Sequence, residues 1–156
     1  MIWDFTRLVS RRLLFWAVPS ILAGAGMILF GNPFWRAFGA QALAWGAVDA
    51  FIAWFGLRRL NKQQGRRSSY QEEAQEASRM RKILWINNAL DVLYVAGGAA
   101  LVFYLGSDSI FWRGTGWGIV LQGAFLFIFD LMHALRVPDP LQLPHLPLFT
   151  HPDHDP

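Results

Sequence analysis

The sequence predicts an all-α, polytopic membrane protein with four transmembrane helices in an antiparallel bundle. Two features of its composition support this class. Hydrophobic residues make up 54% of the 156 residues and charged residues only 16%, whereas charged residues usually account for about a quarter of a soluble domain. The apolar residues are gathered into four long blocks, each close to the roughly 20 residues that a helix needs to cross a bilayer. A soluble bundle would need a polar face on each block, and no block has one that is wide enough.

The predicted helices span about 13–30, 38–57, 70–105 and 117–135, within a membrane domain of residues 1–136. The first block is longer than the apolar core of a secretory signal, contains Pro19 and has no convincing cleavage motif after it, so we expect a retained helix. The residues before it, including Trp3, are expected to form a short lead at the membrane interface. The third helix is predicted to begin near Tyr70, because Ser69 and Glu72 have the spacing of a capping box. We expect its charged first turns to be a solvated face.

The distribution of Lys and Arg predicts the orientation of the helices. Twelve of the 14 basic residues lie before the first helix, between the second and third, or after the fourth, and only Arg36 and Arg113 lie in the other two connections. Both termini are therefore expected in the cytoplasm, and the small size and absence of Cys suit a bacterial inner membrane. Residues 137–156 contain six prolines and are predicted to form a disordered cytoplasmic tail.

Several classes of function are not supported by the sequence. The basic residues fall where a membrane protein needs them, so they do not indicate nucleic-acid binding. The chain has no Cys, which excludes disulfides and thiolate chemistry. It also lacks a Gly-rich phosphate loop, a serine triad pattern and a metalloprotease motif. We therefore expect a protein that is not an enzyme, and the sequence identifies no cofactor and no metal.

Polar side chains inside the predicted helices are the candidate ligand-binding residues: Gln41, Asp49, Asn88, Asp91, Tyr94, Gln122 and Asp130. At 1.5 Å per residue, the three carboxylates lie about 9–12 Å below the cytoplasmic boundary. They are therefore predicted to form one layer, with Asn88 about a turn to its cytoplasmic side. Gln41 and Gln122 are expected nearer the outer face, at matching heights.

Such a layer needs compensation, because an ionised group at the bilayer centre costs roughly 2.5–3.5 kcal/mol. Neighbouring carboxylates in a low dielectric cannot all stay charged unless something balances them. They could be protonated and hydrogen-bonded to Asn88, Tyr94 or Ser20. They could bind a cation through Asp oxygens, an Asn carbonyl and the imidazole of His133. They could also pair with arginines that reach in from the rim, namely Arg58, Arg59, Arg81 or Arg136.

Two functions follow as hypotheses. The leading one is a small integral membrane protein that binds, or helps to transport, a small polar ligand or cation at the carboxylate layer. Conduction through only four helices would require a homo-oligomer or a larger membrane complex. The alternative is a non-catalytic accessory or scaffold subunit, whose buried polar residues only fix the packing of helices in the bilayer.

Two further patterns concern helix packing. Gly46 and Gly97 lie in strips of small residues, which are expected to let neighbouring helices approach closely. The element Phe-Trp-Arg occurs at 34–36 and again at 111–113, each time just before a predicted membrane helix. This recurrence fits a duplicated helix hairpin, and it equally fits an interfacial anchor that recurs for chemical reasons.

Overall fold

The structure, a computed structural model, describes residues 2–63 and 68–139. In this part of the chain the secondary structure consists of four helices: α1 (Ile2–Phe30), α2 (Pro33–Gln63), α3 (Tyr70–Tyr104) and α4 (Ile110–Ala134). All four are long and apolar enough to cross a membrane. The predicted class, an all-α multi-pass membrane protein with a four-helix bundle, is confirmed. Most of the predicted tail, residues 140–156, lies outside the described residues.

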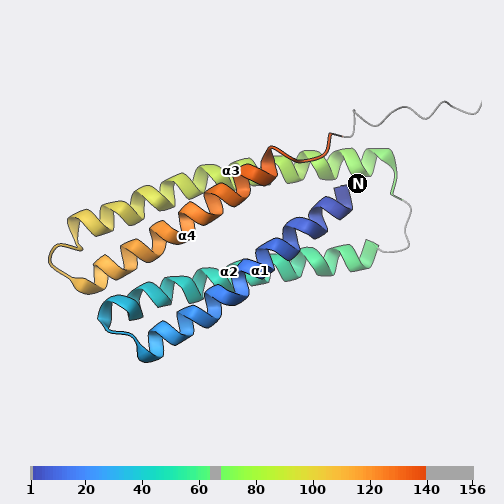
Figure 1. The fold of residues 1–156 in the computed structure, drawn as a ribbon. Coiled ribbons are helices and arrows are strands. Elements are labelled where there is room, and N and C mark those ends of the chain that lie inside the picture. Colours follow the sequence, from blue (N-terminus) through green and yellow to red (C-terminus); the bar gives the residue numbers. More distant parts are fainter. Residues whose placement is uncertain (1, 64–67, 140–156) are drawn as a thin grey trace, which may run out of the picture.

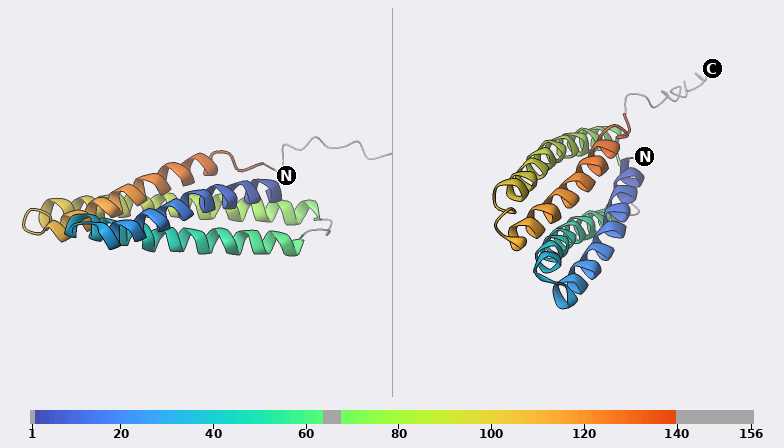
Figure 2. Two further views of the ribbon diagram at one scale, coloured as in Figure 1. Left: turned by 60° about the horizontal axis from the view of Figure 1, so that its bottom comes forward. Right: turned by 60° about the vertical axis from the view of Figure 1, so that its left-hand side comes forward.

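The helices form two hairpins, α1–α2 and α3–α4, which lie side by side (Figures 1 and 2). Both hairpin turns are at one end of the bundle, which we call the hairpin end. The start of α1 and the end of α4 are at the other, which we call the termini end. The two hairpins touch mainly through α2 and α4, and α1 touches α3 only slightly. Two similar hairpins are compatible with duplication, which stays a prediction.

The first residues of α1 belong to the packed interior. Ile2 is buried in a cluster with Ala77 and Leu84 of α3, Ala134 of α4 and Val137. The expectation of an interfacial lead is wrong for this residue, because its helix leans over the ends of α3 and α4. The same part of α1 also contains Arg7, Arg11 and Arg12. These residues need not share the buried position of Ile2, because an α-helix presents successive residues to different sides.

The start of α3 is the predicted capping box. The Ser69 side chain accepts a hydrogen bond from the Glu72 backbone N–H at 3.2 Å, and the Ser69 backbone N–H donates to Glu72 Oε2 at 3.2 Å. The charged first turns are not simply solvated, however. Glu76 is buried and accepts two hydrogen bonds from Arg59 of α2, at 3.0 and 2.9 Å. This ion pair links the two hairpins at the termini end.

Glycines allow the two helices of each hairpin to touch backbone to backbone. A methyl group added to Gly24 of α1 would lie 2.6 Å from the carbonyl oxygen of Gly39 in α2. In the second hairpin, a methyl group on Gly98 would lie 2.9 Å from the carbonyl oxygen of Gly116. Any larger residue at these positions would push the helices apart, so small residues determine this packing.

Glycines also mediate contact between the hairpins. Gly114, near the start of α4, lies against the backbone of Phe34 in α2.

Two glycines that the sequence singles out pack differently within their hairpins. Gly46 of α2 packs on α1, with the carbonyl oxygen of Ala17 3.0 Å from an added methyl group, as its strip of small residues predicts. Gly97, by contrast, has open space where a side chain would be. The packing glycine of α3 is therefore its neighbour Gly98, which corrects the prediction.

Candidate functional site

Three helices contribute the carboxylates of the predicted layer. Asp49 of α2, Asp91 of α3 and Asp130 of α4 are 3%, 5% and 7% exposed. Each carboxyl group is close enough to the other two to interact with them electrostatically. The structure therefore brings together, between the two hairpins, three residues that are widely separated in the sequence.

The carboxyl groups of the layer are incompletely hydrogen-bonded. The side chain of Asn87 lies close enough to the Asp130 carboxyl group to interact with it. The Oδ2 atoms of Asp49 and Asp91 are buried, and no hydrogen-bond partner for either lies in the described part of the chain. A buried polar atom without a partner costs about 1–3 kcal/mol. The layer is thus a place where the protein holds unsatisfied polar groups inside its packed interior.

The arginines that the structure describes at the rim form no ion pair with the layer. Arg59 pairs with Glu76, Arg81 donates to the carbonyl oxygen of Val137 at 3.4 Å, and Arg58 lies over the Trp54 ring, 5.1 Å from its centroid. Within residues 2–63 and 68–139, no ion pair reaches any of the three aspartates. The same residues contain no group of three or more His, Asp or Glu side chains that could hold a metal ion. The arrangement therefore gives no support to a metal centre.

Asn88 and Gln122 connect helices to one another. Asn88 Nδ2 donates to the carbonyl oxygen of Phe127 in α4 at 2.8 Å. Gln122 Oε1 accepts from the indole N–H of Trp16 in α1 at 3.3 Å. Both side chains are buried, and each joins two helices. Their contacts indicate a structural role within the bundle rather than contact with the carboxylates.

The remaining two predicted residues lie at the edge of the site. Tyr94 is 43% exposed and packs edge-on against Trp45 of α2, with ring centroids 4.7 Å apart. Gln41 is half-buried, and its side chain packs on Gly118 of α4. Neither makes a hydrogen bond to a layer carboxylate within the described residues.

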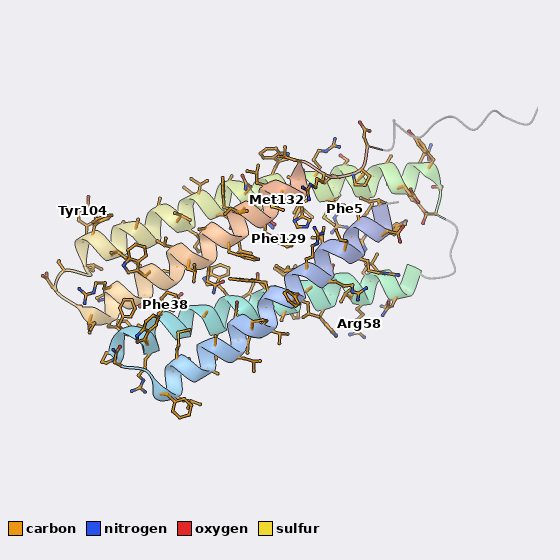
Figure 3. All side chains as sticks on the ribbon, in the orientation of Figure 1. Phe5, Phe38, Arg58, Tyr104, Phe129 and Met132 are labelled. Carbon is orange, nitrogen blue, oxygen red and sulfur yellow. The ribbon has the colours of Figure 1, made fainter. Side chains whose placement is uncertain are left out.

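A cavity of about 230 Å³ lies between all four helices, on the termini side of the layer. Its apolar wall includes Phe129, which packs in a cluster that Phe5 joins (Figure 3). Of the three aspartates, only Asp130 lines it. Trp3 also lines it, and its indole N–H is buried without a partner in the described residues. The other polar or charged residues of the lining are Thr6, Ser10, Arg59, Glu76, Arg79 and Asn87.

Several of these lining residues are absent from the predicted site. Asn87 and Glu76 lie on α3 at steps of three or four residues back from Asp91, through Leu84 and Met80. Residues at that spacing share one face of a helix. Following the polar face of Asp91 back toward the start of α3 would therefore have found both, Asn87 within the predicted membrane block and Glu76 beyond it. The contribution of α1 has no comparable signal, because it depends on how that helix crosses the others.

A sequence model describing a family of unknown function, DUF6992, matches residues 12–131, which is more than half of the chain. The chain belongs to this family. No curated protein and no solved structure matches it. The DUF6992 match includes all three layer aspartates and the Arg59–Glu76 pair, whereas Trp3 and Thr6 lie before its first residue.

Proposed function

We propose that this membrane protein binds, or helps to transport, a small polar ligand that carries a positive charge or several hydrogen-bond donors. One observation carries the proposal: two buried carboxylate oxygens, on Asp49 and Asp91, have no partner in the described chain and lie beside Asp130, which lines the cavity. A positive ligand group next to Asp130 would offset the charge of all three aspartates, because each interacts electrostatically with the others.

The cavity limits the size and chemistry of this ligand. Its 230 Å³ is below the roughly 300–1,000 Å³ typical of pockets for drug-sized molecules. The acceptor groups of Asp130 and Asn87 are at its inner end, and Val9, Leu13 and Phe129 contribute apolar wall. A small organic ammonium compound fits this combination better than a bare metal ion, which would need several oxygen ligands at once.

The proposal does not include catalysis. Ser10 and Thr6 are the hydroxyl groups in the described lining of the cavity, and no His lines it beside them. A hydroxyl nucleophile normally needs an adjacent base of that kind. At the hairpin end the helix backbones touch through glycines, so we do not propose a path for a ligand through one copy of the chain. Transport would therefore involve a homo-oligomer, a larger membrane complex or a change in helix packing.

The alternative proposal is an accessory or scaffold subunit. It is favoured by Asn88 and Gln122, whose hydrogen bonds join different helices. Such bonds are worth about 0.6 kcal/mol on average in membranes, and at most about 2. In this case the aspartates would also serve only to hold helices together, and conservative changes to them would alter no binding property.

Thermal unfolding of the purified protein in detergent distinguishes the two functions. The added probes would be choline, ethanolamine and Mg²⁺, each against NaCl at equal ionic strength. Saturation at 100 times the dissociation constant stabilises a protein by about 2.7 kcal/mol. We expect an ammonium probe to raise the melting temperature of the wild type and of the Asp108→Asn control, an exposed turn position, but not of Asp130→Asn. If all variants respond alike to every probe, the scaffold function is supported instead.

The proposal also places the termini end, and with it the cavity, on the cytoplasmic side of a cell inner membrane. Because the chain has no Cys, single cysteines can report the orientation. Lys62 lies near the termini end and Ser107 in the α3–α4 turn, and both are exposed. In intact cells, a membrane-impermeant maleimide should label Ser107→Cys, and should label Lys62→Cys only after permeabilisation. The opposite pattern would contradict the orientation.

A further inference from the structure

A second hollow lies on the outside of the bundle, in the groove between α1 and α4. It has a volume of about 430 Å³. Its middle is apolar and partly formed by Trp16, which stacks on Phe125 with ring centroids 3.7 Å apart. Met132 of α4 also lines it (Figure 3). The groove thus extends along the helices on a surface that faces lipid in a spanning protein.

The termini end of this groove is positively charged. Arg12 and Arg136 both line it, and both guanidinium groups are close enough to the His133 ring to interact with it electrostatically. No acidic residue is among the described residues of the lining. Two like charges therefore meet at the mouth of an apolar groove whose described lining contains no acidic residue.

A chain of hydrogen bonds holds Arg12 in this position. His133 is buried, and its Nδ1 is 2.6 Å from the carbonyl oxygen of Phe129. Since a carbonyl oxygen can only accept, Nδ1 must donate. Nε2 is then free to accept from Arg12, whose NH1 atom is 3.4 Å away. The buried imidazole of His133 thus connects the Arg12 guanidinium group to the backbone of α4, at the mouth of the groove.

We infer that this groove binds one anionic phospholipid. Its phosphate lies between Arg12 and Arg136, and an acyl chain lies along Trp16, Phe125 and Met132. The charge pattern selects this occupant, because anionic headgroups gather at cytoplasmic surfaces and basic pockets between membrane helices bind them. The termini end is the end that the distribution of Lys and Arg predicts to be cytoplasmic. The inference does not depend on the carboxylate layer, which lies inside the bundle.

Native mass spectrometry with dioleoyl phosphatidylglycerol or phosphatidylcholine tests this inference. The variants are Arg12→Gln and Arg136→Gln, with Arg11→Gln as the matched control. Arg11 is exposed on the same turn of α1 but does not line the groove. We expect the wild type and the control to retain one phosphatidylglycerol in preference to phosphatidylcholine. Each groove variant should bind it about fivefold more weakly, the effect of one basic residue near a membrane surface.

Several results would overturn the inference. Equal phosphatidylglycerol binding by all variants would mean that the arginines do not contact the lipid. An equal loss in Arg11→Gln would mean a diffuse attraction to the charged helix rather than a site. A dimer that dissociates only in the groove variants would mean that a second copy of the chain occupies the groove. Arg136 is exposed and follows α4, so Arg136→Gln keeps the test valid if Arg12→Gln fails to fold, as judged by circular dichroism.

Discussion

The two ends of the bundle solve the problem of helix packing in different ways. At the hairpin end, Gly24 meets Gly39 and Gly98 meets Gly116, so helix backbones touch. Toward the termini end the helices separate around a cavity, and the contacts there include an Arg59–Glu76 ion pair. Between them lies the carboxylate layer, with polar atoms that the described chain does not satisfy. The comparison separates close backbone packing at the hairpin end from the proposed binding site toward the termini end.

The largest predicted effect is at the hairpin end. Gly98→Leu would force a branched side chain against the backbone of Gly116, and overpacking of this kind costs about 3 kcal/mol. Gly97→Leu is the matched control, because the space beside Gly97 is open and the change should cost less than about 0.5 kcal/mol. Unfolding in detergent measures both. Equal losses would show that α3 is rotated relative to the structure described here.

A smaller loss is predicted for the ion pair at the termini end. Arg59 is partly exposed and Glu76 largely buried, so breaking the pair should cost about 1–2 kcal/mol, between the values for surface and buried pairs. A double-mutant cycle with Arg59→Gln and Glu76→Gln isolates their interaction from other effects. A coupling energy close to zero would mean that the pair does not hold the hairpins together.

The smallest effects separate structural polar residues from the candidate site. Asn88→Ala removes a hydrogen bond between α3 and α4 and should cost about 1 kcal/mol.

Asp49→Asn, measured without ligand, should leave stability unchanged or raise it, because it removes the charge that Asp49 presents to Asp91 and Asp130. Binding sites often carry such a cost to stability. A clear loss for Asp49→Asn would instead make the layer part of the packing.

The layer could be predicted because helix geometry converts residue number into depth. With 1.5 Å of rise per residue, counting from the basic rim was enough to place Asp49, Asp91 and Asp130 at one height. The fixed helical period similarly predicted the packing of Gly46. Depth and helical period are properties of a single helix, so both features can be predicted without knowing how the helices are arranged around one another.

The cavity and the choice between neighbouring residues could not be predicted in this way. Gly97 and Gly98 differ by only one position, about 100° around the helix, so a strip of small residues does not say which one faces α4. Arg59 and Glu76 come from helices whose approach depends on the whole bundle. Ile2 lies before the first predicted membrane block, and its burial follows only from the path of α1 over α3 and α4.

The most direct test of the central claim is whether the cavity prefers positive charge. Ser10 lines the cavity and is buried, and Ser10→Cys would be the single cysteine of the chain. Charged clefts change reaction rates with ions by about tenfold or more. The account predicts that a cationic methanethiosulfonate reacts there about tenfold faster than an anionic one, relative to exposed Ser107→Cys, and that adding Asp130→Asn removes this preference. Equal rates for both reagents, or a preference that survives Asp130→Asn, would contradict it.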